Sequence, residues 1–325
     1  MMMRAHNSGI FAALVLGLAT APASAQNFPA KTVRLVVAFA AGGTTDILAR
    51  ALGQKLTAAT GQQFIVDNRP GAGGTIGSDL VAKSPADGYT LNFGSTSSIA
   101  VAPNLYQHLP YDLLRDFAPV TEVATGPIVL AIHASLPVQN VKELIALAKA
   151  RPGKLNFGSS GNGTSLHLAG EYLKFLAHID MTHVPYKGIG QALPDLVSGQ
   201  LQLMFSDMAP FDPFVKAGKL RAIAVTTGKR SPLYPEIPSI SESDVPGFDL
   251  AGWYGVLAPA GTPKAVVDML AGEFTKAMNA TDMKERYVTL GLEPVASSPE
   301  QFGVFIRSEL SKWGEIIKRS GTKLE

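Results

Sequence analysis

The sequence contains no cysteine, only two tryptophans, and charged residues at just 17% of its 325 positions. The absence of cysteine excludes thiol catalysis, disulfides and thiolate metal sites. The formal net charge is +2 and the basic residues are scattered, so the sequence indicates no surface for nucleic acid or an anionic membrane. With 46% hydrophobic residues, the chain can bury a large core, as one large domain or two domains of ordinary size.

Common nucleotide-binding and catalytic motifs are also absent from the sequence. No G-x-x-x-x-G-K-[ST] loop occurs, and "AAGGTTD" at positions 40–46 lacks the G-x-G-x-x-G spacing. Neither a G-x-S-x-G elbow nor an H-E-x-x-H pair occurs. His167 lies near a predicted helix start without a recognisable nucleophile or acid, which favours a packing or capping role. His178 and His183 form too weak a pattern for a metal site. We therefore predict no catalytic residue, metal or cofactor.

The first 25 residues contain the three parts of a secretory signal peptide in order. Arg4 supplies a basic start, positions 10–19 are apolar, and Ala23-Ser24-Ala25 is a small-residue cleavage site. The apolar run is shorter than the roughly 20 residues that span a bilayer. A buried N-terminal helix is the alternative interpretation. We expect cleavage near Ala25, a mature chain that begins near Gln26, and export.

Beyond the signal peptide, apolar strands alternate with amphipathic helices. Positions 33–39 are almost continuously apolar, as in a strand buried on both faces. A glycine- and threonine-rich loop follows at positions 40–45, and the next helix ends at Gly61. The same order of strand, loop and helix returns at positions 64–82 and again from position 89. This alternation predicts an α/β protein with a mainly parallel sheet flanked by helices.

The phrase "LNFGS" occurs twice, at positions 91–95 and 155–159, which predicts two similar lobes. A long β-prone run at positions 118–133 is broken at Gly126-Pro127, and such a run suits a chain crossing from one lobe to the other. The strand-like segment that begins near position 250 can cross back. We therefore predict one lobe from residues 26–126 plus 250–325, and a second lobe from residues 127–249.

Three loops between a strand and a helix share the composition of an anion site. Glycine loosens the backbone, hydroxyl groups are clustered, and the helix start presents unpaired N–H groups and the positive end of the helix dipole. None of the three loops contains lysine or arginine. If loops of both lobes line one cleft, they can hold a ligand carboxylate. The candidate ligand-binding residues are Gly42, Gly43, Thr44, Thr45, Asp46, Ser95, Thr96, Ser160, Gly161, Gly163, Thr164 and Ser165.

A purely structural role is the alternative for each of these loops, because the same residue types cap helices in most α/β proteins. Asp46 either caps the first helix or orders a bridging water. Asp207 ends a strand near the presumed cleft and joins the ligand-binding candidates. It either binds an amino or hydroxyl group of the ligand or caps a helix.

Five sequence stretches together resemble a known family. These are "AFAAGGTTDILAR", "VDNRPGAGGTIGSDLVAKSPADGYTL", "NFGSSGNGTSLHLAGE", "HVPYKG" and "DMAP". They are similar to the extracytoplasmic receptors of tripartite tricarboxylate transporters, the Bug family. The resemblance covers essentially the whole mature chain.

The resemblance implies a two-lobed periplasmic binding protein of type II, a Venus flytrap that closes on a small organic carboxylate. It also implies that the receptor delivers this ligand to the membrane subunits of a tripartite tricarboxylate-type transporter. In the family, two loops hold the carboxylate, and they correspond to residues 42–46 and 160–165 here. A monomer is expected, because a flytrap must dock on a membrane complex.

Two other functions stay open at the level of the sequence. The receptor could instead pass ligand occupancy to a sensor protein. A secreted hydrolase or isomerase on the same scaffold would need an activated nucleophile or base, and the sequence indicates none. The family-typical loop at positions 71–75 either touches ligand or only turns the chain.

Overall fold

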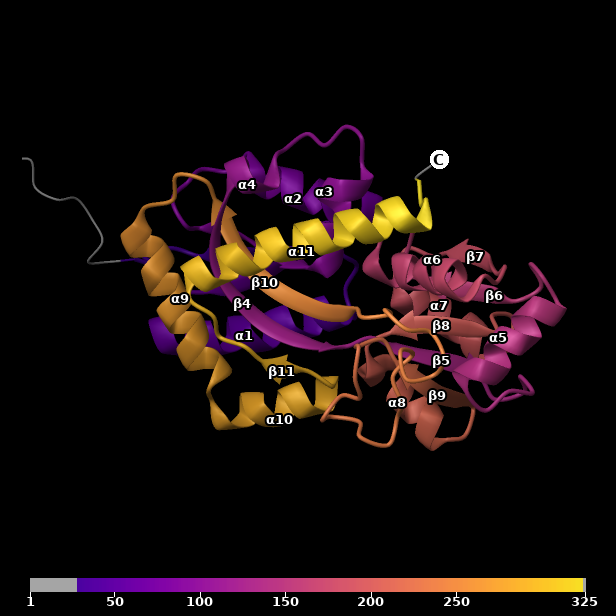
Figure 1. Cartoon of the computed structure of the whole chain (residues 1–325). Coiled ribbons are helices and arrows are strands. Elements are labelled where there is room, and N and C mark those ends of the chain that lie inside the picture. The colour runs from indigo at the N-terminus through magenta and orange to yellow at the C-terminus, as the bar shows by residue number, and fades with distance from the viewer. Residues whose placement is uncertain (1–27, 324–325) are drawn as a thin grey trace, which may run out of the picture.

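Residues 28–323 are described in a computed structural model, in which they form two lobes that each contain one sheet (Figure 1). The predicted signal peptide, residues 1–25, lies outside the described residues. The first sheet has the strand order β11-β4-β10-β3-β1-β2, and the second has the order β7-β6-β8-β5-β9. Helices flank both sheets, so the two-lobed α/β architecture predicted from the sequence is confirmed.

The strands of the first sheet are β1 (Val33–Val37), β2 (Phe64–Asn68), β3 (Thr90–Ser95), β4 (Phe117–Pro127), β10 (Ala251–Pro259) and β11 (Glu293–Pro294). Those of the second are β5 (Val129–His133), β6 (Asn156–Ser159), β7 (Thr182–Pro185), β8 (Leu203–Ser206) and β9 (Leu220–Val225). The "LNFGS" repeats therefore supply β3 of one sheet and β6 of the other.

The helices of the first lobe are α1 (Thr44–Thr60), η1 (Ala72–Gly74), α2 (Thr75–Ala82), η2 (Ser97–Val101), α3 (Ala102–Leu105), α4 (Leu113–Asp116), α9 (Lys264–Met278), α10 (Thr281–Leu290) and α11 (Pro299–Ser320). The second lobe has α5 (Val141–Ala150), α6 (Ser165–Ala177), α7 (Ile189–Val197) and α8 (Met208–Lys216). No helix among residues 28–323 is both long enough and apolar enough to cross a membrane.

Strand β1 shows why the apolar run at its positions forms a central strand. Val33, Leu35, Val36 and Val37 are completely buried, and β1 pairs in parallel with β2 on one side and β3 on the other. A strand covered by helices on both faces needs apolar side chains at successive positions. The carboxyl ends of β1 and β3 therefore point in one direction, toward the loops that precede α1 and η2.

Most strands of each sheet run in one direction, as predicted, and a minority run against them. In the first sheet, β10 runs antiparallel to β3 and β4, and β11 runs antiparallel to β4. In the second, β5 runs antiparallel to β8 and β9. The physical reason is the crossing between lobes. Strand β10 enters the first sheet from the side of the second lobe, so its first residues lie beside the carboxyl end of β3, with Tyr254 opposite Ser95.

The chain passes between the two sheets along adjacent paths. Strand β4 ends at Pro127, Ile128 follows, and β5 begins at Val129. Ala251, at the start of β10, pairs with Pro127.

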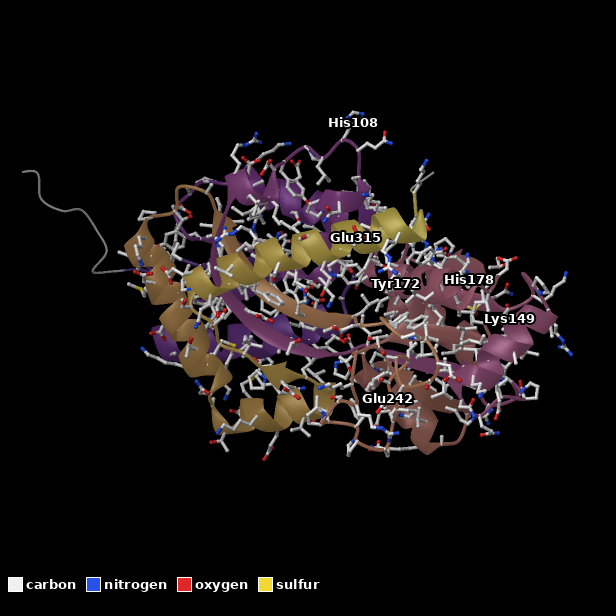
Figure 2. All side chains as sticks on the ribbon, viewed as in Figure 1. His108, Lys149, Tyr172, His178, Glu242 and Glu315 are labelled. Carbon is white, nitrogen blue, oxygen red and sulfur yellow. The ribbon has the colours of Figure 1, made fainter. Side chains whose placement is uncertain are left out.

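Helix α11 also reaches the second lobe, and Figure 2 shows Tyr172 of α6 below the C-terminal half of α11. The Arg319 guanidinium lies 5.9 Å from the centroid of the Tyr172 ring.

Candidate functional site

A pocket of about 580 Å³ lies between the two lobes. Ligand pockets for small molecules have volumes of about 300–1,000 Å³. Residues of α1, η2, α6, α7, α8 and β10, or of the loops before them, line it, so both lobes contribute walls. The predicted site residues that line the pocket are Gly42, Gly43, Thr44, Thr45, Ser95, Thr96, Ser160, Ser165 and Asp207.

Helix α1 presents its N-terminus to this pocket. Gly43 is its N-cap, and no side chain caps the helix from that position. The backbone N–H groups of the first turn therefore remain available to a ligand, beside the hydroxyls of Thr44 and Thr45. Gly42 has a φ of 88°, in the left-handed region that favours glycine, and this lets the chain turn sharply into the helix.

Asp46 lies behind the α1 loop and does not line the pocket. Its carboxylate accepts hydrogen bonds from the Gly42 N–H at 2.9 Å and from Nδ2 of Asn68 at 3.0 Å. Burial opposes ionisation of Asp46, but the bonds from Arg50, Gly42 and Asn68 together lower the pKa of its carboxyl below the usual value. Asp46 thus fixes the loop from the third position of the helix, without being its N-cap.

The two loops that follow the "LNFGS" strands meet across the gap between lobes. The Ser165 N–H, at the start of α6, donates to Oγ of Ser97 at 2.9 Å, and the two hydroxyl oxygens are 3.0 Å apart. Both serines line the pocket. Ser97 had not been predicted, although it directly follows the candidates Ser95 and Thr96 in the serine-rich loop.

The second-lobe loop is shaped from behind by Gly161, Gly163 and Thr164, which do not line the pocket. Thr164 is the N-cap of α6, because its Oγ1 accepts from the His167 N–H at 3.3 Å. The same hydroxyl donates to the Gly161 carbonyl at 2.8 Å. Gly161 and Gly163 have φ angles of 133° and 73°, so both give the loop conformations that other residues rarely adopt.

Sequence reasoning did not recognise that α7 also begins at the pocket. Gly188, with a φ of 143°, is the N-cap of α7, and no side chain caps that helix. Residues 187–191 line the pocket, including the ammonium-bearing Lys187. The pattern "YKGIG" was a usable signal, because a glycine directly before an apolar helix resembles the α1 start. Trp253 and Tyr254 of β10 also line the pocket and were missed.

Asp207 joins the second lobe to the first at the pocket wall. The Tyr254 hydroxyl donates to Oδ2 of Asp207 at 2.8 Å, and Asp207 itself is half-buried. Burial raises the pKa of the Asp207 carboxyl above its ordinary value, while hydrogen bonds from Thr44 and Tyr254 act in the opposite direction. Asp207 occupies the N-cap position of α8, but its side chain makes no capping bond. It therefore faces the pocket instead of its own helix.

A histidine pair supports the second-lobe loop from below. The rings of His167 and His183 stack with centroids 3.9 Å apart, and Nε2 of His183 is 2.7 Å from Oγ of Ser159. Burial lowers the pKa of His167 to about 4 and that of His183 to about 3. Ser159 is completely buried, so a ligand in the pocket does not reach this pair. Nδ1 of His167 accepts from the Gly163 N–H at 3.3 Å, in agreement with the predicted packing role.

Within residues 28–323, no group of three or more His, Asp or Glu side chains is placed to hold a metal ion. The pocket can instead hold an anion. Helix starts from both lobes meet there, together with several hydroxyl groups and one lysine.

Comparison with known proteins places the chain in a family. The family model for the tripartite tricarboxylate transporter family receptor matches residues 48–322. The chain belongs to this receptor family. The protein BugT of Bordetella pertussis is 36% identical over 318 residues, which cover 98% of this chain and 97% of BugT. The resemblance stated from the sequence motifs is thereby confirmed.

Solved structures of receptors agree with the fold and with the two-lobed arrangement. A protein of R. palustris, solved with adipate, has 37% identity and a TM-score of 0.86, covering 90% of this chain and 98% of its own. MatC from Rhodopseudomonas palustris, solved with bound malate, has 31% identity and a TM-score of 0.84, covering 89% and 100%.

Proposed function

We propose that this receptor binds a small organic carboxylate in the pocket between its lobes, in the periplasm, and delivers it to a tripartite tricarboxylate-type transporter. One observation carries the proposal: uncapped helix starts from both lobes, α1 and α7, line the same pocket as the Ser97–Ser165 contact. Helix N-termini favour anions through free N–H groups and the helix dipole. Related receptors solved with adipate and malate support a carboxylate as the ligand class.

Ligand binding between lobes also provides the mechanism of lobe closure. Contacts from Thr44 and Thr45 belong to one lobe, and contacts from Ser165 and Lys187 belong to the other. A ligand that touches both sets binds the closed arrangement more tightly than the open one, so it shifts the population toward closure. The crossings at Ile128 and before Ala251 are the connections about which residues 127–249 would rotate.

A thermal-shift screen of protein stripped of carried-over ligand by unfolding and refolding tests the ligand class. The panel contains mono-, di- and tricarboxylates, aromatic acids and amino acids. A carboxylate present at about 100 times its dissociation constant is expected to stabilise the protein by about 2.7 kcal/mol. No shift with any carboxylate, together with a shift for a neutral solute, would overturn the proposal.

Replacement of one pocket hydroxyl tests the proposed site itself. Thr45→Val keeps the side-chain volume but removes a hydroxyl that lines the pocket. One lost hydrogen bond corresponds to about 0.5–1.5 kcal/mol, so we expect the dissociation constant to rise roughly 2- to 12-fold. Thr289→Val, on the exposed face of α10, is the matched control. Equal affinities of the two variants in calorimetric titration would show that the Thr45 hydroxyl does not bind the ligand.

The remaining features of the proposal have separate tests. We expect cleavage before Gln26 on export, which the mass of the periplasmic protein reveals. We also expect a monomer by light scattering.

The bound carboxylate is expected to leave the protein chemically unchanged, because the Ser159–His183 pair lies outside the pocket lining. A sensor role would appear as a ligand response that is lost on deletion while uptake continues.

A further inference from the structure

The glycine loop at residues 71–75 lies outside the pocket, because none of its residues belongs to the pocket lining. Four successive residues of the loop, Gly71, Ala72, Gly73 and Gly74, have positive φ angles, of 132°, 47°, 63° and 99°. Glycine adopts such angles readily, and its lack of a side chain also lets other parts of the protein approach the backbone closely. Ligand contact is therefore not the role of this loop, and its neighbours indicate another.

On one side, the glycine loop packs against the serine-rich turn that leads into η2. A Cβ atom added to Gly74 would lie only 2.7 Å from Cβ of Ser98, a distance that real Cβ contacts essentially never show. Ser98 directly follows Ser97, which lines the pocket. The loop is therefore in close contact with the turn that carries Ser97.

On another side, the glycine loop meets the second lobe. A Cβ atom added to Gly73 would lie 3.3 Å from the carbonyl oxygen of Gly163 and 3.1 Å from the hydroxyl oxygen of Tyr106. Both distances are tighter than most contacts of real Cβ atoms, so a side chain at this position would push its neighbours away by a few tenths of an ångström. Gly73 belongs to the first lobe and Gly163 to the second, so the two backbones come together across the gap between lobes.

This backbone contact accompanies the hydrogen bond that joins the two lobes at the pocket. Gly163 lies just before α6, whose first residue, Ser165, donates its N–H to Oγ of Ser97 at 2.9 Å. The first N–H groups of a helix have no intrahelical acceptor, so the bond from Ser165 depends on how closely the other lobe approaches. Hydrogen bonds of this kind extend to about 3.2 Å. An outward shift of Gly163 by a few tenths of an ångström would therefore weaken the bond.

We propose that the glycine loop at residues 71–75 positions the binding loop of the second lobe, and that Gly73 acts through Gly163 by leaving room for its close approach. Gly73 is a positioning residue, because it acts on the pocket without lining it. Its effect on binding rests on the proposed receptor function. To that function it adds a contact outside the pocket, which keeps Ser165 within reach of Ser97 and so fixes the spacing between two walls of the site.

Hydrogen exchange of the Ser165 amide tests this role without any ligand. The exchange rate is measured by nuclear magnetic resonance in protein that has been stripped of ligand by unfolding and refolding. We expect the rate to rise by about fivefold or more in Gly73→Ala, because the added methyl group separates the two loops. Gly73→Leu should raise it further, since a larger side chain needs more room. The alanine variant keeps the test valid if the leucine variant does not fold.

Gly61→Ala and Gly61→Leu are the matched controls in the same lobe. Gly61 has a φ of 72°, close to the 63° of Gly73, so other residues meet a similar backbone cost at both positions. No atom lies within 4 Å of a Cβ added at Gly61. We expect the Ser165 amide in these controls to exchange within about twofold of the wild-type rate. Equal rates in the Gly61 and Gly73 variants would overturn the inference.

Tyr106→Phe separates the contact between lobes from the contact within the first lobe. Phenylalanine removes the hydroxyl oxygen that lies nearest to the added Cβ and leaves the Gly163 carbonyl in place. The double variant Gly73→Ala/Tyr106→Phe should therefore keep the fast Ser165 exchange of Gly73→Ala. A return to the wild-type rate would show that pressure on Tyr106 was the cause, and would contradict the role of Gly163.

Carboxylate binding connects the contact between lobes to function. The probes are adipate and malate, with which related receptors were solved, and the wider carboxylate panel. For each acid that binds the wild type, we expect a dissociation constant about fivefold higher or more in Gly73→Ala than in Gly61→Ala. Faster Ser165 exchange with unchanged affinity would overturn the positioning role in binding. If no carboxylate binds the wild type, the receptor function fails, and the exchange rates alone decide whether Gly73 controls the approach of the two loops.

Discussion

Gly170→Ala is expected to destabilise the protein by about 2 kcal/mol, although alanine is the better helix former. Gly170 lies in α6, and a Cβ atom there would be 2.2 Å from Cε2 of Phe157 on β6. The Phe157 ring is completely buried, so moving it away from the added Cβ would disturb the packing around it. Overpacking of this kind costs about 1–3 kcal/mol or more, and the gain in helix propensity, about 1 kcal/mol, offsets only part of it.

The matched control is Gly272→Ala in α9, where no atom lies within 4 Å of the added Cβ. Because Gly272 is exposed in the middle of a helix, we expect this variant to gain about 0.5–1 kcal/mol. Thermal unfolding of both variants measures the contrast, at about 2–4 °C for each kcal/mol. A stabilised Gly170→Ala protein would show that α6 does not pack against β6 as closely as described.

Gly170 also matters for the binding site, because it sets how closely α6 approaches the sheet. The N-terminus of this helix carries Ser165, which contacts Ser97 of the other lobe. A shift of α6 away from β6 would move the Ser165 N–H relative to the pocket. Weaker carboxylate binding is therefore expected in Gly170→Ala, in addition to lower stability.

The sequence predicts local elements well, because their signals are local. The strand and helix predicted within positions 64–82 form as β2 (Phe64–Asn68) and α2 (Thr75–Ala82). The break predicted at Gly126-Pro127 lies one residue further along, at Ile128, which separates β4 from β5. The reversed directions of β10 and β5 were not predicted, since strand direction depends on where the chain returns to a sheet. The antiparallel pairing of β10 follows from its entry at the second-lobe side, which apolar periodicity does not encode.

The candidate site was predictable where a loop directly follows a strand and directly precedes a helix. Thr44 and Ser165 satisfy that pattern, and both line the pocket. The pattern does not distinguish a side chain that faces the pocket from one that supports the loop. Asp46 and Thr164 belong to the supporting kind. Tyr254 was missed because it reaches the pocket from a strand that crosses between lobes, which only the tertiary structure brings near α8.

Glu122→Gln is expected to stabilise the protein at pH 8 by on the order of 1–3 kcal/mol. Glu122 lies in β4 and is only 6% exposed. Burial, assisted by repulsion from Glu309, raises the pKa of its carboxyl from 4.5 to about 7. Two indole N–H groups, of Trp253 and Trp313, donate to Oε2 of Glu309 and hold that carboxylate in place. At neutral pH and above, the buried charge of Glu122 therefore lowers the free energy of unfolding. Glutamine carries no such charge.

The pH dependence identifies the cause, because its sign follows from the raised pKa. Between about pH 4.5 and 7 the folded state holds the Glu122 proton more tightly than the unfolded state does. Its contribution to stability is present below pH 4.5 and is lost as the pH rises through 7. The difference in melting temperature between Glu122→Gln and wild type should therefore grow from pH 5 to pH 8. The buried histidines cancel in this difference, since both proteins contain them.

Glu285→Gln, at an exposed position of α10, provides the control, and its difference from wild type should stay nearly constant with pH. A constant difference for Glu122→Gln would mean that packing of the amide, and not loss of a buried charge, determines its stability. Destabilisation that increases toward pH 8 would contradict the raised pKa itself. In that case a partner would stabilise the ionised Glu122 carboxylate by more than burial and repulsion from Glu309 destabilise it.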